Sequence, residues 1–174
     1  IAPYFLEEVR KYLEKEYGSQ RIYQGGLRVY TTLDSATQVA ANRSVRDWLR
    51  VMDRRSRGFV PPTETVLKDG KFPDRLHLED WEGPILAGDV VRGVVLASER
   101  GIAVVRIGEY EARIGPAEIA WTRHSNVAEV LKPGTVAPFR IEALPEAGSK
   151  DLRVTLEQEP EVQGALLALE PKTG

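Results

Sequence analysis

The first residues of the chain carry their apolar side chains at helical spacing. One face of the predicted helix is formed by Phe5, Val9, Tyr12 and Leu13, which recur at i, i+4, i+7 and i+8. Pro3 suits a first-turn position and Gly18 suits a left-handed C-terminal cap. The pattern predicts a helix over about residues 3–17.

Strict alternation follows. The stretch 27–33 alternates Leu, Val, Thr and Leu with Arg, Tyr and Thr, which predicts a strand. Asp34 then stands where an N-cap belongs, before a second helix whose apolar positions keep a spacing near 3.6 residues. This helix runs out at "DRRSRG", where Arg54, Arg55 and Arg57 are able to bind an anion. We interpret the three arginines as part of a solvated linker.

The pattern changes from Phe59 onward. Residues 59–88 contain prolines and an Asp69–Gly70 turn signal but no helical stripe, which predicts a loop-rich connector with one short extended piece. Five short strands with turn residues between them are predicted next, at 89–97, 102–108, 110–115, 136–144 and 152–158.

One helical turn is predicted at 116–121, between the third and fourth of these strands. This order predicts a small barrel of the oligonucleotide/oligosaccharide-binding (OB) kind, with a five-stranded sandwich as the alternative. Gly93 within a strand and the Pro133–Gly134 turn suit strong coiling. The fold class is therefore α+β.

The last apolar run, "VQGALLALE" at 162–170, is typical of a strand that is buried on both faces. The following Pro-Lys-Thr-Gly, 171–174, has the composition of a turn. We expect strand 162–169 to pair with strand 27–33 or to self-associate through an exposed edge.

Composition narrows the function classes. The net charge is −2, from 24 basic and 26 acidic residues, which disfavours nucleic-acid binding because that needs a basic face. There is no cysteine, and therefore no thiolate or disulfide chemistry. No apolar run is long enough to span a membrane, and Ile1 does not open a signal peptide. We interpret the chain as a piece of a longer protein.

Lys172-Thr173-Gly174 matches one of the three short motifs of serine enzymes that react with penicillin. Those enzymes also need Ser-x-x-Lys, because serine is a weak nucleophile without a nearby base. None of the serines has lysine three places on, and no Ser-x-Asn element is present. We therefore predict a turn here and no catalytic residue.

Cofactor and metal sites have equally little support. His77 and His124 are the only histidines, and neither has a second ligand at metal-binding spacing. We expect no cofactor and no metal.

An OB barrel is also able to bind single-stranded nucleic acid by stacking bases on aromatic side chains. The predicted strands offer Tyr110 and Phe139 for stacking, with five arginines offset by four glutamates. An independent nucleic-acid-binding module stays as the alternative function.

Several stretches resemble class A penicillin-binding proteins, the bifunctional peptidoglycan synthases of bacteria. "APYFLEEVRKYLEKEYG" is similar to the helix that leaves the family's glycosyltransferase domain, and "GGLRVYTTLDSATQVAA" to the start of its transpeptidase domain. "QEPEVQGALLALEPKTG" is similar to that domain's opening strand and turn. The middle, with Ala120-Trp121, Arg123 and "LKPG", resembles the OB-like insert of the family's 1A branch.

The resemblance implies three parts. Residues 1–58 are the linker helix, strand and helix, 59–158 the barrel insert with its connector, and 159–174 the first strand and turn of the transpeptidase domain. The implied role is a non-catalytic interdomain module that spaces the two catalytic domains. The family's catalytic residues match no position of this chain.

The resemblance also implies partners and a location. The partners are the rest of the parent synthase and an envelope regulator such as an outer-membrane lipoprotein activator, with no nucleic acid and no direct membrane span in this chain. The location is periplasmic, with the parent chain anchored in the cytoplasmic membrane. The candidate partner-binding residues are Trp81, Trp121 and Arg123, beside the 59–88 connector and the 122–134 loop. Packing of both tryptophans against the barrel is the competing interpretation.

Overall fold

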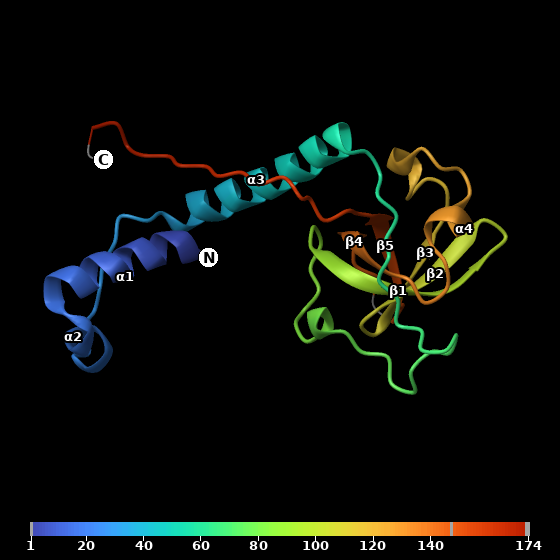
Figure 1. Cartoon of the computed structure of the whole chain (residues 1–174), viewed down its shortest axis with the longest axis horizontal. Helices are drawn as coiled ribbons and strands as arrows, with labels where there is room; N and C mark the ends of the chain where they lie inside the picture. The colour runs from blue at the N-terminus through green and yellow to red at the C-terminus, as the bar shows by residue number, and fades with distance from the viewer. Residues whose placement is uncertain (1, 147, 173–174) are drawn as a thin grey trace. The chain divides into compact units, whose positions relative to one another are not determined.

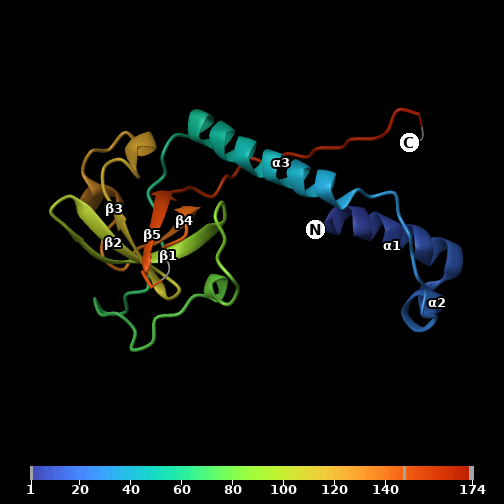
Figure 2. The same ribbon diagram turned by 180° about the vertical axis from the view of Figure 1, so that it is seen from behind.

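The computed structural model describes residues 2–146 and 148–172. The chain forms two compact units, one made of residues 1–49 with 163–174 and the other of residues 50–162. Figure 1 and Figure 2 show the helices of the first unit and the barrel of the second from opposite sides. The domain limits at 58/59 and 158/159 stay a prediction.

The helices of the first unit begin and end where the sequence indicates. Helix α1 spans Pro3–Tyr17, and Gly18 ends it with φ +78° and a backbone hydrogen bond of 2.9 Å to Glu14 O. Helix α3 spans Ser35–Ser56, and Asp34 Oδ1 accepts a 2.6 Å hydrogen bond from the Thr37 N–H as its N-cap. A short helix α2, Ser19–Gln24, was not predicted.

Two predicted strands of this unit are wrong. Neither 27–33 nor 162–169 forms a ladder with any part of the chain that the structure describes. Leu167, expected to be buried on both faces, is 84% exposed. Alternation and apolar runs indicate which side chains suit a sheet. A strand also needs a partner that hydrogen-bonds to its backbone groups, and segments 27–33 and 162–169 do not pair with each other. Residues 171 and 172 do lie in a turn, whereas 173 and 174 lie outside the described residues.

The second unit is the predicted five-stranded barrel, closed in the order β1-β2-β3-β5-β4. The parallel β3–β5 pair completes a barrel whose other pairs are antiparallel. This is the OB arrangement, so the sandwich alternative is wrong. The strands are β1 Val90–Glu99, β2 Ile102–Ile107, β3 Tyr110–Ile114, β4 Val136–Ala143 and β5 Asp151–Leu156.

Alternating side chains of the five strands fill the barrel. Phe139, Ile107, Ile114, Ile141 and Leu156 are among the largest fully buried side chains. Gly93 is needed in β1 because a Cβ there would lie only 2.7 Å from Val105 Cγ1 and 2.8 Å from Ile107 Cγ1. Phe139 was one of two candidate stacking platforms for nucleic acid, and it is wholly inside the barrel, so that assignment is wrong.

Loops and short helices complete the unit. The connector makes the predicted turn at Asp69–Gly70, where both residues have positive φ and Lys68 and Lys71 exchange backbone hydrogen bonds of 3.0 Å. It also forms a 3₁₀ turn, η1 at Glu79–Trp81. Between β3 and β4 lie a second 3₁₀ turn, η2 at Ala120–Thr122, and helix α4, Val127–Val130.

Candidate functional site

The three predicted partner-binding residues lie at two elements, because Trp81 ends the 3₁₀ turn η1 whereas Trp121 belongs to η2 and Arg123 follows it directly. Trp81 is half-buried against the barrel, and its indole N–H donates a 2.8 Å hydrogen bond to Arg92 O in β1. Trp121 is also half-buried, and its N–H donates to Leu156 O at 2.8 Å. Arg123, directly after η2, is exposed with a left-handed backbone at φ +65°. Trp81 and Trp121 therefore have distinct packing partners.

Charged side chains gather where the chain runs into the barrel unit and where it leaves. We call this group the ionic junction; it comprises Arg50, Asp53, Arg54, Arg57, Arg140, Glu157 and Gln158. Its members come from the last turns of α3 and the residue directly after it, from β4 and from the segment that follows β5. The spacing in sequence exceeds 100 residues for the Asp53–Gln158 contact.

Glu157 is the acceptor for one half of the junction. Its side chain is 2% exposed and contacts three arginines. Arg54 forms an ion pair with Oε1, the Arg140 Nε donates to Oε2 at 3.2 Å, and the Arg50 Nε lies 3.9 Å from Oε2. A carboxylate taken out of water is stable only with such partners, so these contacts determine whether the junction holds.

Asp53 is the acceptor for the other half, and it is also 2% exposed. Oδ2 accepts hydrogen bonds from Arg57 Nη2 at 2.9 Å and from Gln158 Nε2 at 2.6 Å. Oδ1 accepts from the Glu161 N–H at 3.1 Å. A side chain of the incoming helix thus binds the backbone of the outgoing segment directly.

Gln158 and Trp121 close the junction on the barrel side. The Gln158 amide also donates to Gly58 O at 3.1 Å and accepts from the Val60 N–H at 2.8 Å. The Arg54 guanidinium lies 4.1 Å from the centre of the Trp121 ring, a cation–π distance. Trp121 therefore packs within the structure of the module, as the competing interpretation of this residue held.

The interpretation of the "DRRSRG" segment as a solvated linker is wrong for Arg54 and Arg57, whereas Arg55 is exposed as expected. Arg54 and Arg57 are mostly buried and carry ion pairs with carboxylates more than 100 residues away in the chain. The sequence did contain a sign of this buried polar group. Every second side chain of β5, at Leu152, Val154 and Leu156, is buried, and Gln158 is the next residue in that alternation. A polar residue at a buried parity position needs a polar partner, but its identity does not follow from the sequence.

Asp53 makes the unit 50–162 sensitive to acid. Burial raises the pKa of Asp53, but the hydrogen bonds from Arg57, Gln158 and the Glu161 backbone outweigh burial and hold the pKa below its usual value. The stabilisation is fully present above the unfolded-state pKa of about 3.9 and is lost as the pH falls through the lower folded-state pKa. We expect thermal unfolding followed across this acid range to show a steeper loss of Tm for the parent chain than for Asp53→Asn. Equal pH slopes in the two proteins would contradict this assignment.

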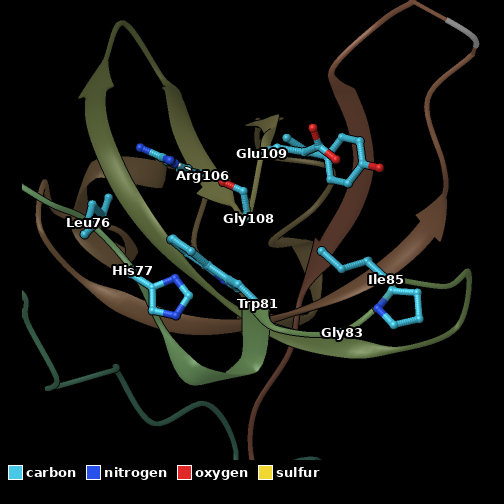
Figure 3. A pocket seen from close by; sticks show the side chains of 10 residues that line it. Leu76, His77, Trp81, Gly83, Ile85, Arg106, Gly108 and Glu109 are labelled. Carbon is cyan, nitrogen blue, oxygen red and sulfur yellow. Dashed lines mark hydrogen bonds between the residues drawn. The ribbon is translucent and has the colours of Figure 1, made fainter.

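A hollow of about 350 Å³ lies on the barrel away from these contacts, and Figure 3 shows it from close by. We call it the indole hollow, because the Trp81 ring lies between Arg106 and Glu109 of the β2–β3 end and His77 of the connector. Its walls are formed by Leu76, His77, Trp81, Gly83, Pro84, Ile85, Arg106, Gly108, Glu109 and Tyr110. Trp81, selected from sequence as a contact residue, thus lines a real concavity.

Residues 2–146 and 148–172 contain no cluster of three histidine, cysteine or carboxylate side chains able to hold a metal ion. Within the same residues no helix has the length and apolar character needed to cross a membrane. Neither His77 nor His124 belongs to a metal-binding group there; His77 lies edge-on to Trp81 and His124 edge-on to Phe59.

Comparisons with known proteins give two kinds of match. A family model described as "S1 RNA binding domain" matches residues 86–150, which is most of the barrel. Penicillin-binding protein 1A of Rickettsia conorii is 29% identical over 99% of this chain and 21% of its own length. Penicillin-binding protein 1A of Vibrio cholerae is 41% identical over 69% of this chain and 14% of its own length.

A solved structure shares the fold. The crystal structure of penicillin-binding protein 1A from Haemophilus influenzae matches 91% of this chain and 22% of its own, with a TM-score of 0.67 and 21% identity. The chain spans about a fifth of the length of the Rickettsia relative.

Proposed function

Over 99% of its length the chain is homologous to a segment of penicillin-binding protein 1A, and on this premise we propose that it is the non-catalytic interdomain module of a peptidoglycan synthase. In this proposal the parent chain polymerises glycan strands and cross-links their peptides, anchored in the cytoplasmic membrane with this module in the periplasm. The module spaces the two catalytic domains and presents a docking surface to an envelope regulator.

The observation that carries the proposal is the proximity of the two ends of the barrel unit. Asp53, before the barrel, binds the Glu161 N–H, after it, at 3.1 Å, and Arg57 binds Glu159 O at 3.1 Å. A module whose ends meet is easily inserted into another domain, because it leaves the path of the host chain nearly unchanged. The three-part division at 1–58, 59–158 and 159–174 belongs to this proposal. The contacts of the ionic junction connect the end of α3 to the barrel unit.

The absence of Ser-x-x-Lys from the sequence supports a non-catalytic role. The proposal predicts that pure chain 1–174 acquires no covalent label from a fluorescent β-lactam, because no serine has a lysine placed to activate it. The measurement is in-gel fluorescence, with a full-length class A penicillin-binding protein as the positive control. Stoichiometric labelling of the folded chain would overturn the proposal, provided that the label is lost when the chain is denatured before the β-lactam is added.

The docking surface we propose comprises Arg123, the 122–134 loop and the 59–88 connector, with Trp81 and Trp121 supporting it from beneath. Arg123 is exposed, and it has no ion pair with any part of the chain that the structure describes. The regulator is an outer-membrane lipoprotein activator or an envelope protein of that kind. Loops held by a rigid barrel carry such contacts more often than barrel walls do.

A pull-down tests the docking surface. Cross-linked bacterial envelope extract is captured on chain 1–174, and we expect one envelope protein that excess free chain removes by competition. Arg123→Glu should abolish capture, whereas Arg100→Glu should retain it, because Arg100 lies outside the proposed surface. Arg100 is a matched control, since it is also exposed and also has a positive φ, +52°. Retained capture by Arg123→Glu would exclude this face, and an empty pull-down would leave spacing as the module's role.

Nucleic-acid binding is the alternative, favoured by the match to an S1 RNA binding domain. The outer faces of β2 and β3 carry Arg106 and Arg113 beside Glu111, whereas Tyr110 pairs with buried Ile107 and packs against the core. Such a face has little stacking capacity and no excess of positive charge. Binding of single-stranded RNA that weakens steeply with salt would support this alternative over the docking module.

A further inference from the structure

One wall of the indole hollow is apolar, because the indole N–H of Trp81 already donates a hydrogen bond elsewhere. Trp81 donates its N–H to Arg92 O, so its ring face is what it offers inside the hollow. Pro84 and Ile85 extend this apolar wall, and Ile85 Cδ1 lies 3.5 Å from the position a Cβ on Gly108 would occupy. A ligand here needs an apolar flat face to cover the indole.

The other side of the hollow keeps polar groups free. Arg106 uses its Nε in a 3.0 Å hydrogen bond to Gly108 O, and within the described residues its two terminal nitrogens make no hydrogen bond. The Glu109 carboxylate and the Tyr110 hydroxyl likewise have no partner in that part of the chain. All three residues line the hollow, and between them they offer several hydrogen-bond donors and acceptors along its wall.

The two charges of this wall have opposite signs. Arg106 is the second-last residue of β2 and Glu109 lies in the β2–β3 turn, and both line the hollow. A polyanion would meet the Glu109 carboxylate, and a cationic side chain would meet the Arg106 guanidinium, which already lies 5.8 Å from the Trp81 ring centre. The wall therefore suits a neutral ligand that both donates and accepts hydrogen bonds.

Backbone also borders the hollow. A Cβ on Gly83 would meet no atom within 4 Å, and Gly108 lies on the opposite side with φ +63°. A ligand ring is therefore able to approach the chain at Gly83 without a side chain in its path. The cavity, about 350 Å³, lies at the lower end of the range for small-ligand sites.

We propose that the indole hollow binds a sugar ring of a neutral glycan chain. The ring's C–H face covers Trp81, and its hydroxyl and amide groups bond Arg106, Glu109 and Tyr110. OB barrels are used for oligosaccharides as well as oligonucleotides. The inference rests on the proposed function, since a peptidoglycan synthase produces glycan strands, and it gives the module a hold on that product.

The test uses chain 1–174 and chitotetraose, a neutral chain of four N-acetylglucosamine units, followed by two-dimensional amide NMR. We expect saturable shifts of the Trp81 indole N–H and the Gly108 amide at millimolar sugar. Arg106→Gln and Glu109→Gln should each weaken binding about tenfold, because each removes one charge-assisted hydrogen bond. Trp81→Ala should remove binding, whereas Trp48→Ala, which deletes a 61% exposed tryptophan on α3, should not change it.

Three results overturn the proposal. They are the absence of a saturable shift at Trp81, unchanged affinity in both Arg106→Gln and Glu109→Gln, and tighter binding of single-stranded oligouridylate than of sugar at the same signals. The two surface variants keep the test valid if Trp81→Ala fails to fold. If the chain captures a regulator but shows no sugar-dependent shift, the glycan site is rejected and the docking module is retained. If the chain shows the sugar-dependent shift but captures no regulator, only docking is rejected.

Discussion

Replacing Glu157 with alanine should lower the free energy of unfolding of the barrel unit by about 3–5 kcal/mol, the usual cost of removing one partner from a buried ion pair. The carboxylate is 2% exposed and contacts Arg50, Arg54 and Arg140. Alanine removes the carboxylate that these three cations share in a poorly hydrated site. The cost comes mainly from this lost neutralisation rather than from the lost apolar contacts of the side chain.

Urea unfolding monitored by tryptophan fluorescence measures this effect, since Trp121 lies against Arg54. Glu64→Ala is the matched control in the same unit, because Glu64 faces Arg92 in an exposed pair at 3.6 Å. Exposed pairs contribute little, so the control should unfold close to the parent chain. Equal midpoints for Glu157→Ala and Glu64→Ala would show that the ionic junction does not stabilise the unit.

The junction also bears on the proposed role. Loss of Glu157 removes a contact between the end of α3 and the segment that follows β5. The substitution leaves the sequence of the 122–134 loop, which includes Arg123, unchanged. If the module docks a regulator, Glu157→Ala at a temperature where it stays folded should still capture that partner. Stability and docking are thereby separated by experiment.

Replacing Phe139 with alanine should cost about 3–5 kcal/mol of unfolding free energy, because a large core side chain is lost and the barrel cannot collapse fully around the space. Phe139 is fully buried in β4, where it pairs with Val91 of β1 and Leu156 of β5. A closed barrel is a poor site for relaxation, since each strand is bonded on both sides. The expected result is a barrel that is unfolded or marginal at 37 °C.

The measurement is again denaturant unfolding, with amide hydrogen exchange of β1 and β5 as a local readout. Phe72→Ala is the matched control, since Phe72 in the connector is 40% exposed. It should leave the midpoint near that of the parent chain. A loss as large in Phe72→Ala as in Phe139→Ala would mean that the connector, and not the barrel interior, carries the stability.

Much of the local structure followed from the sequence because its causes are local. Helical spacing with Gly18 and Asp34 at the ends predicted α1 and the start of α3, and turn chemistry at Asp69–Gly70 was confirmed. Alternation with regular turn signals located all five barrel strands within two residues at each end. Side-chain parity and backbone propensity act over a few residues, so the chain reveals them directly.

The candidate sites were predictable only in part. Trp81 was selected for its residue type, and the structure shows why it matters, since the connector lays it beside the β2–β3 end to form a hollow. The other walls, Arg106 and Glu109, had no signal of their own. Trp121 was selected on the same grounds and proved to cover Arg54 in the ionic junction.

What the sequence determined by itself is the two long helices, the five barrel strands, the barrel class and the lack of a penicillin-reactive motif set. Tertiary structure alone decided which elements pair and which charges meet. The stretches 27–33 and 162–169 read as strands but have no ladder partner in the described chain, and Asp53 finds Gln158 only because the barrel brings its two ends together. Pairing and charge neutralisation are relations between distant residues, so they exist only after the chain has folded.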